Sequence, residues 1–282
     1  MEHTCHTDKD YMFDLVGKIG SMALIRKEDN DIDYNIFARL GGQLKPGMIW
    51  VSSGATEIGR LDYIKRSGHE LSGDAEENKT DYAAQGQAIL MQNYRQFVNP
   101  NISVRQILVE HMHFNDEEKR EHIRRLLIRS ACQGAVPIIN YNDPVSPQEN
   151  RKMEISALRR RTDDVVECVD NDETAAVLVT LVKTRVLVIL TSTEGIYTDP
   201  YDSSTLIREI IGNTPEELIS KINEAQKSCV GASRAGAQGA HAKLEYMKKP
   251  ALLGTAVIIG NGKYSLDQLV NGAVPCTRIS LK

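Results

Sequence analysis

The chain has 282 residues, of which 41% are hydrophobic, 26% are charged and 5% are aromatic. These fractions are typical of a soluble globular protein made of one large domain or two small ones. The formal net charge of −4 argues against a general nucleic-acid binder, because such proteins carry a basic excess. The five cysteines are scattered without a CxxC pair, so the sequence predicts neither a zinc site nor a disulfide framework.

The N-terminal segment is polar and resembles neither a signal peptide nor a transit peptide. We expect residues 1–12 to form a disordered or extended tail. No apolar stretch approaches the roughly 18 residues that suggest a membrane span. We therefore expect a cytoplasmic protein with no membrane partner and no nucleic-acid partner.

Short apolar runs alternate with longer amphipathic segments along the chain. Strands are predicted at Phe13–Ile19, Met48–Ser52, Ser103–Val109, Ala135–Asn140, Val186–Thr191, Thr255–Gly260 and Thr277–Leu281. Helices are predicted at Ile32–Gln43, Tyr82–Phe97, Asp116–Gln133, Asp172–Thr184, Thr214–Cys229 and Gln238–Lys248. This alternation predicts βαβ units and a mainly parallel sheet with helices on both faces, and the single Trp50 is predicted to lie in the core.

Two stretches interrupt this regular order. Leu61–Thr80 is rich in charge and glycine, which predicts a long exposed loop. Ser146–Val165 is polar and contains three consecutive arginines, so it is predicted to be an excursion from the domain. Two interpretations of this insert stay open: a partly helical flap over a ligand, or a solvated surface segment.

Small, polar or charged residues directly follow four of the predicted strands. Ligands gather at the carboxyl ends of the strands in open parallel sheets, so four such turns in one chain imply a shared cleft. The turns are Lys18-Ile19-Gly20-Ser21, Ser52-Ser53-Gly54-Ala55, Asn140-Tyr141-Asn142-Asp143 and Thr191-Ser192-Thr193-Glu194-Gly195.

The chemistry that suits these groups is phosphoryl transfer, which needs positioned reactants and positive charge on the transferring oxygens. Lys18 and Lys243 are the candidate cations, and the glycine-rich stretch Gly231–Gly239 would let backbone approach a polyphosphate. Solvated lysines and a flexible loop are the alternative interpretations. Asp170-Asn171-Asp172 precedes a predicted helix, where it would act as an N-cap or as a ligand contact. Neither a Walker A pattern nor GxGxxG occurs.

These motifs, taken in order, resemble the amino acid kinase superfamily and within it the glutamate 5-kinases. LVGKIGS and VSSGATEIGR are similar to the family's first two turns, and VPIINYNDPV is similar to its substrate loop. VDNDETAAVLV, ILTSTEGIYTDP and GAQGAHAKLE are similar to its later elements. The resemblance runs from about Phe13 to the C-terminus and is interrupted by the Ser146–Val165 insert. The resemblance is to the family pattern without the C-terminal PUA domain of its longer members.

The resemblance implies an αβα sandwich of the carbamate kinase-like fold. Residues 13–282 would form one domain, with an acceptor-binding lobe at about 13–165 and an ATP-binding lobe at about 166–282. It also implies a homo-oligomer, a dimer or tetramer, that phosphorylates the γ-carboxylate of glutamate with ATP and Mg²⁺, as in proline biosynthesis. No dedicated metal-binding residues are implied.

The resemblance further assigns roles to individual residues. Lys18 and Lys243 would neutralise the phosphoryl group, and Asp170 would orient the two lysines. The implied ATP-binding residues are Lys18, Gly20, Ser21, Thr191, Ser192, Gly236, Ala237, Gln238, Gly239 and Lys243. The implied substrate-binding residues are Ser53, Gly54, Ala55, Asn142, Asp143 and Asn171.

The sequence departs from the family pattern at the predicted site. Tyr141 replaces the family's loop glutamate, and Ser192 and Glu194 replace two aspartates. The insert lies between Asp143 and Asn171. Two alternatives follow from these departures: an enzyme of the same fold with another acceptor, such as a phosphate, phosphonate or different amino acid, or a non-catalytic sensor of nucleotides or metabolites.

Overall fold

The computed structural model describes residues 11–26, 28–162, 165–168, 170–199, 201–229 and 239–282. The chain divides into two compact units. Unit 1 comprises Met1–Ile19, Gly47–Val51 and Asp172–Lys282, and unit 2 comprises Gly20–Pro46 and Ser52–Asn171. The predicted lobes, with their boundary at residues 165 and 166, stay a prediction, and most of the expected tail at 1–12 lies outside the described residues.

Unit 1 is built on a large, mostly parallel sheet. Its strands are β1 (Phe13–Ile19), β4 (Met48–Ser52, whose last residue belongs to unit 2), β7 (Thr184–Thr191), β10 (Glu209–Gly212), β11 (Ala256–Asn261) and β12 (Cys276–Leu281). They lie in the order β10-β12-β11-β7-β1-β4. β7 pairs in parallel with β1 and β11, whereas β12 is antiparallel to β11 and parallel to β10. The short strands β8 (Ile196–Tyr197) and β9 (Leu206–Ile207) form an antiparallel pair, and η3 (Ser203–Thr205) precedes β9.

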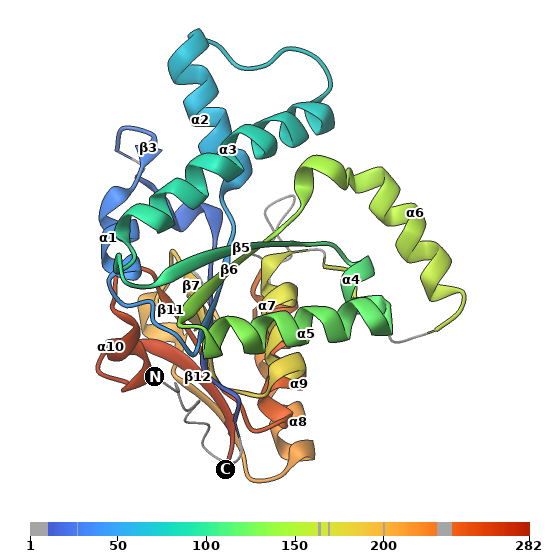
Figure 1. The fold of residues 1–282 in the computed structure, drawn as a ribbon. Coiled ribbons are helices and arrows are strands. Elements are labelled where there is room, and N and C mark those ends of the chain that lie inside the picture. Colours follow the sequence, from blue (N-terminus) through green and yellow to red (C-terminus); the bar gives the residue numbers. More distant parts are fainter. Residues whose placement is uncertain (1–10, 27, 163–164, 169, 200, 230–238) are drawn as a thin grey trace. The chain divides into compact units, whose positions relative to one another are not determined.

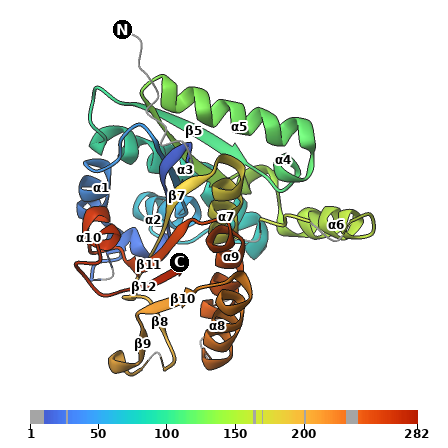
Figure 2. The same ribbon diagram turned by 90° about the horizontal axis from the view of Figure 1, so that it is seen from below.

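Helices cover both faces of the unit 1 sheet. They are α7 (Asn171–Val182), α8 (Pro215–Ser228), α9 (Gly239–Leu252) and α10 (Leu266–Val270). In both ribbon views α7, α8 and α9 lie on one side of β7, β11 and β12, and α10 lies on the other (Figures 1 and 2). This layering confirms the predicted α/β class with helices on both faces of a mainly parallel sheet.

The core of unit 1 is apolar on both faces of its sheet, which explains why its strands are continuous hydrophobic runs. Trp50 in β4 has no exposed surface, as predicted. A Cβ placed on Gly17 of β1 would lie 2.0 Å from the indole ring of Trp50, so only glycine fits there. The tryptophan therefore fixes how closely this part of the sheet packs.

Unit 2 combines a parallel strand pair with several helices. β5 (Ser103–Val109) pairs with β6 (Ala135–Tyr141), and the short strands β2 (Ile25–Arg26) and β3 (Asp31–Ile32) form an antiparallel pair. The helical elements are η1 (Ser21–Ala23), α1 (Tyr34–Gly41), α2 (Ala55–Ser67), α3 (Ala75–Phe97), α4 (Met112–Asn115), α5 (Glu117–Cys132), η2 (Asp143–Val145) and α6 (Gln148–Arg159). Within the described ranges, no helix joins the length and the apolar character that crossing a bilayer requires.

The predicted long loop at Leu61–Thr80 is wrong, because most of it is helical. α2 continues to Ser67, and α3 begins at Ala75, seven residues before the predicted start. A close helix contact stabilises this region: a Cβ on Gly59 would lie 1.9 Å from the carbonyl oxygen of Tyr82. Gly59, two residues before the predicted loop, is therefore the residue that lets α2 and α3 touch.

The Ser146–Val165 insert is partly helical, as one of the two interpretations required. α6 occupies Gln148–Arg159 and extends to one side of the β5–β6 pair in unit 2 (Figures 1 and 2). Ile155 on α6 is buried, whereas Met153 is 70% exposed. One face of the insert helix therefore packs against unit 2, and the other faces solvent.

Candidate functional site

Two lysines in unit 1 share one buried carboxylate. Lys18 lies at the end of β1, Asp172 in the first turn of α7, and Lys243 in the first turns of α9. The Nζ of Lys18 lies 2.6 Å from Oδ1 of Asp172, and the Nζ of Lys243 contacts Oδ2 of the same carboxylate. The side chains of Lys18, Asp172 and Lys243 are 10%, 5% and 19% exposed. The lysine cluster, as we call these three residues, thus carries one unit of positive charge in excess.

The electrostatics of the lysine cluster keep Asp172 ionised. Burial acts to raise the pKa of this carboxyl group, but the two ammonium groups outweigh burial, and the pKa is lowered overall. The N-terminus of α7 also favours negative charge at this position. A fixed carboxylate between two cations can orient them toward an anionic ligand without cancelling their charge.

Asp172, and not the predicted Asp170, is the residue that contacts both lysines. Asp170 instead lines a pocket in unit 2. The reason is helix geometry: α7 starts at Asn171, and residues two apart at a helix start are rotated by about 200° around its axis. The contact with both lysines that we expected of Asp170 is therefore made by Asp172, and the orienting role stays a prediction.

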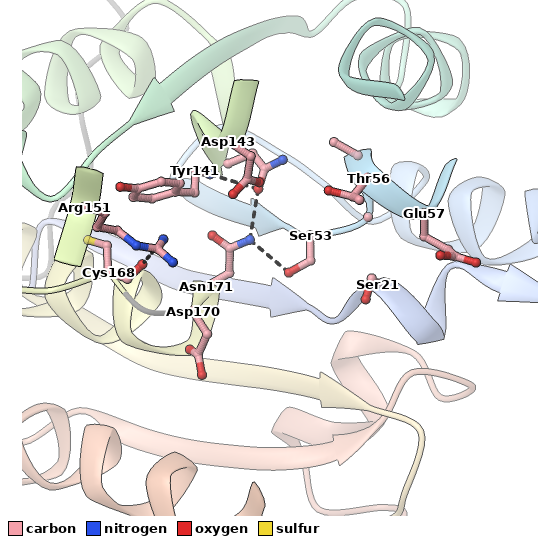
Figure 3. A pocket seen from close by; sticks show the side chains of 13 residues that line it. Ser21, Ser53, Thr56, Glu57, Tyr141, Asp143, Arg151, Cys168, Asp170 and Asn171 are labelled. Carbon is pink, nitrogen blue, oxygen red and sulfur yellow. Dashed lines mark hydrogen bonds between the residues drawn. The ribbon is translucent and has the colours of Figure 1, made fainter. Parts of the chain in front are cut away.

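Unit 2 contains a polar pocket of about 360 Å³. The segments that follow β4 and β6, the start of α2, the helix α6 and the residues before α7 all contribute to it (Figure 3). Its lining consists of Ser21, Ser53, Gly54, Ala55, Thr56, Glu57, Asn140, Tyr141, Asp143, Arg151, Cys168, Asp170 and Asn171. A volume of this size suits a small molecule.

Asn171 is the centre of a hydrogen-bond network in the pocket. Its Nδ2 donates to Oγ of Ser53 and to Oδ1 of Asn140, each at 2.9 Å (Figure 3). Asn140 in turn donates to Oε1 of Gln87 at 2.9 Å. The Oδ1 of Asn171 is buried and has no hydrogen-bond partner among the described residues. An unsatisfied buried acceptor costs free energy, so a ligand N–H or O–H group would be bound favourably there.

The turn after β4 brings backbone close to the pocket. Gly54 has φ +110°, a left-handed conformation that L side chains rarely adopt, and a Cβ there would lie 3.0 Å from Cδ1 of Leu24. The preceding Ser52 is buried and accepts a hydrogen bond of 2.8 Å from the hydroxyl of Tyr94. Glycine is therefore required for this turn, which leads directly into α2.

Asp143 and Arg151 are oppositely charged groups in the pocket lining. Burial raises the pKa of Asp143 to about 6, and the nearby guanidinium of Arg151 limits this rise. Arg151 comes from the insert helix α6, and its Cζ lies 4.9 Å from the centre of the Tyr141 ring. Its NH1 also donates to the carbonyl oxygen of Cys168 at 3.3 Å.

Tyr141 connects the pocket wall to the insert. Its hydroxyl lies 2.9 Å from Oγ of Ser146 and 3.3 Å from Nδ1 of His111. The Nε2 of His111 lies 3.0 Å from a carboxylate oxygen of Glu154 on α6. Burial raises the pKa of Tyr141 and lowers that of His111, so both groups are neutral near pH 7. Tyr141 is thus a fixed aromatic wall.

Five of the six predicted substrate-binding residues line the pocket. They are Ser53, Gly54, Ala55, Asp143 and Asn171. Asn142 does not line it, because its Nδ2 donates to Oε1 of Glu110 at 2.9 Å. Ser21, predicted to bind ATP, also lines this pocket, and Gly20 caps the short helix η1.

The remaining predicted ATP-binding residues belong to unit 1 or lie outside the described residues. Gly236, Ala237 and Gln238 lie outside them. Gly239 begins α9 with φ +45°. Thr191 bonds to Thr193, and the carbonyl oxygen of Ser192 accepts a hydrogen bond from Asn261 at 3.2 Å. Their role toward a nucleotide stays a prediction.

Sequence reasoning did not identify Arg151 as a pocket residue. It also did not include Thr56, Glu57 and Cys168, whereas Asn140 belongs to one of the four predicted cleft turns. A usable signal was present for Arg151, because a polar insert lies between two predicted ligand residues. That signal could not say which of its arginines turns inward.

The comparisons with known proteins agree with this architecture. The model of the amino acid kinase family matches residues 15–261. A glutamate 5-kinase of Cupriavidus taiwanensis is 30% identical, and one of Cupriavidus pinatubonensis is 29% identical. Each match covers 94% of this chain and 67% of the relative, so the chain spans about two thirds of their length.

Solved structures are similar in fold. The UMP kinase from Ureaplasma parvum superposes with a TM-score of 0.53 at 10% identity, covering 95% of this chain and 99% of that one. The UMP kinase from Bacillus anthracis gives 0.52 at 11% identity, with 94% and 95% covered. These two likenesses concern the fold alone.

Proposed function

Because the chain belongs to the amino acid kinase family, we propose that it transfers the γ-phosphoryl group of ATP to a carboxylate of a small acid. The first candidate acceptor is the γ-carboxylate of glutamate, with glutamyl 5-phosphate and ADP as products. The observation that carries the proposal is the buried lysine cluster, Lys18, Asp172 and Lys243. The names of the glutamate 5-kinase relatives support the choice of acceptor.

The proposed reaction needs little covalent work from the protein. A carboxylate oxygen of the acceptor attacks the γ-phosphorus, the bond to the oxygen between the β- and γ-phosphorus breaks, and ADP leaves with the electron pair. Most carboxylates are ionised at pH 7, so no general base is required. Lys18 and Lys243 would neutralise the charge on the equatorial oxygens, and Asp172 would hold their ammonium groups in place.

Mg²⁺ is expected as the counter-ion of the ATP phosphates. The described residues contain no group of three or more His, Cys, Asp or Glu residues that could hold a metal ion. The ion would therefore be bound mainly through phosphate oxygens and water, as Mg²⁺ in nucleotide sites usually is. That the reaction requires Mg²⁺ stays a prediction.

The pocket in unit 2 is the proposed acceptor site. Ser53, Asn171 and Asp143 offer a hydroxyl, an unsatisfied carbonyl oxygen and a carboxyl group to a small polar ligand. Asn171 is followed directly in the chain by Asp172 of the lysine cluster. Location in the cytoplasm and assembly into a homo-oligomer accompany this proposal as expectations.

The test is ADP release by the full chain with a panel of small acids, with and without Mg²⁺. Glutamate or a related acid should raise turnover above the background rate, and Lys243→Ala should abolish that increase. Lys249→Ala is the matched control, because Lys249 is an exposed lysine of the same helix α9. Lack of turnover with every acid, and no effect of Lys243→Ala, would contradict the proposal; ATP binding without turnover would favour a sensor.

A further inference from the structure

The pocket in unit 2 contains one guanidinium, that of Arg151, which forms no close ion pair with a described carboxylate. Four of its lining residues carry a carboxyl or guanidinium group: Glu57, Asp143, Arg151 and Asp170. Glu57 is paired with Arg60 of the same helix at 2.8 Å. Arg151 forms no ion pair within 4 Å in the described part of the chain; its contacts there include the carbonyl oxygen of Cys168 and the ring and hydroxyl of Tyr141. A half-buried guanidinium outside any close ion pair keeps N–H donors that favour an anionic ligand.

The surroundings hold the Arg151 guanidinium in place and leave donors free. The Cζ of Arg151 lies over the Tyr141 ring, 4.9 Å from its centre, and NH1 donates to the carbonyl oxygen of Cys168. A guanidinium has five N–H donors, so several are left for a ligand. Its planar fork matches the two oxygens of a carboxylate or phosphate. A cation fixed in this way binds an anion with little loss of side-chain entropy.

The insert helix that carries Arg151 is anchored on the same side. Arg151 and Glu154 are three residues apart, so they share one face of α6. Glu154 contacts buried His111, and Tyr141 contacts Ser146 at the start of the insert. These contacts make α6 a wall of the pocket and favour the first of the two interpretations of the insert.

The pocket groups are arranged in sequence along the cavity. Arg151 and Tyr141 lie at one end, Asn171 and Asp143 lie in the middle, and Ser21 and Thr56 lie toward the other end (Figure 3). The middle groups are hydrogen-bond acceptors, which suits an ammonium or hydroxyl group. The Arg151 end suits an anion. A ligand that matches this order carries an anionic group next to an ammonium or hydroxyl group.

We propose that Arg151 is a specificity-determining residue that binds the anionic group of the acceptor that is not phosphorylated. The acceptor is accordingly a small acid with two anionic groups. This inference rests on the proposed function for the identity of the other, reacting group. The proposal gives the insert helix α6 a role in selecting the acceptor. The lysine cluster and the nucleotide cannot have this role, because they act on the phosphoryl group that is common to every acceptor.

The experiment compares glutamate with 4-aminobutyrate, which has the same spacing between its carboxylate and its amino group but lacks the α-carboxylate. Charge-assisted hydrogen bonds suggest that Arg151→Gln weakens binding of glutamate by about 10- to 100-fold. The loss should appear in KM for glutamate, with kcat and the KM for ATP changed little. The preference for glutamate over 4-aminobutyrate should fall by the same factor, and Arg151→Lys should restore part of it.

Lys152→Gln is the matched control, because Lys152 is the neighbouring residue of α6, is exposed and undergoes the same change of charge. It should leave every constant within about twofold. Circular dichroism checks that each variant is folded. If Arg151→Gln does not fold, Arg151→Lys replaces it in the comparison of the two acids. An equal loss with both acids, or no loss with either, would overturn the inference.

Calorimetric titration of the same acids, with a non-hydrolysable ATP analogue present, separates this inference from the proposed function. If the protein binds glutamate without turnover and Arg151→Gln abolishes binding, the inference stands and the proposed function fails. If glutamate is phosphorylated but Arg151→Gln keeps the full preference over 4-aminobutyrate, the proposed function stands and the inference fails. Absence of binding by every two-anion acid tested also overturns the inference.

Discussion

Replacing Asp172 with Asn removes the shared counter-charge of two buried lysines. The side chains of Lys18 and Asp172 are only 10% and 5% exposed, so the ammonium groups cannot recover full hydration in the variant. Removing one partner of a buried ion pair typically costs about 3–5 kcal/mol, because the remaining charge is left uncompensated. That cost is a large part of the about 5–15 kcal/mol that stabilises a typical protein. We expect Asp172→Asn to lower the free energy of unfolding by this amount.

Urea denaturation of the full chain measures this loss. Asp14→Asn is the control, because Asp14 pairs with Arg185 at 3.5 Å on the surface of the same unit, with both side chains at least half exposed. Exposed pairs contribute about 0–1 kcal/mol, so the control should change stability little. In the proposed reaction, kcat of Asp172→Asn should also fall by about 100-fold, since the lysines lose their fixed position. A urea midpoint equal to that of the unmodified chain would refute the reasoning.

The same carboxylate predicts a pH dependence with a definite sign. The pKa of Asp172 is lowered in the folded state from an ordinary value of 3.8. Its stabilising contribution is therefore complete above about pH 4 and is lost as the pH falls from there toward the folded pKa. The difference in unfolding free energy between the unmodified chain and Asp172→Asn should shrink over that acidic range. A difference that is constant down to pH 2 would contradict the assignment, and titration by urea denaturation at each pH checks it.

Three further predictions concern unit 2. Asp143 has a pKa raised to about 6 by burial, so acceptor KM should fall as the pH rises through 6, and Asp143→Asn should remove this dependence in a pH series of initial rates. Gly59→Ala should destabilise the chain by about 3 kcal/mol in thermal denaturation, because its Cβ would lie 1.9 Å from a backbone oxygen. Gly68→Ala is the control: open space surrounds this residue, but its φ is +79°, so the substitution should cost about 1 kcal/mol. Tyr141→Phe removes a hydroxyl that contacts Ser146 at 2.9 Å and should speed amide hydrogen exchange in α6; unchanged exchange would mean that the hydroxyl does not anchor the insert.

The strands could be predicted closely because parallel strands buried on both faces are continuous apolar runs. Phe13–Ile19 and Met48–Ser52 have the predicted bounds. Caps carry comparable information for helices: the predicted helix at Thr214–Cys229 begins at Thr214, which accepts a hydrogen bond from the backbone N–H of Glu217. In each of these cases the signal is local in the sequence, so no distant contact was needed to interpret it.

The missed helix α2 shows what local signals omit. Its sequence is polar and contains Gly59, which disfavours a helix in isolation. Ion pairs along the helix, Glu57 with Arg60 and Asp62 with Arg66, together with the close contact to α3, stabilise it in the folded chain. The glycine acts through a tertiary contact, and a tertiary contact cannot be recognised from one sequence.

The residues of the candidate site likewise fall into those that could be predicted from the sequence and those that depend on tertiary structure. Gly54 was predicted as a cleft residue because it follows a predicted strand, whereas Asn171 was predicted as a substrate contact through the family resemblance; both line the pocket. The exchange of Asp170 for Asp172 and the entry of Arg151 both depend on where a helix begins and which way it is rotated. A shift of one residue at the start of a helix turns every side chain by about 100°, and sequence patterns do not fix helix starts that finely.

The burial of Trp50 gives the chain a built-in reporter of one unit. It is the single tryptophan, it has no exposed surface, and it belongs to unit 1. Its emission therefore follows the unfolding of unit 1, whereas the far-ultraviolet circular dichroism of the helices follows both units. Coincident transitions from the two signals would mean that the whole chain melts as a single cooperative block, and separated transitions would mean that each unit holds its structure independently.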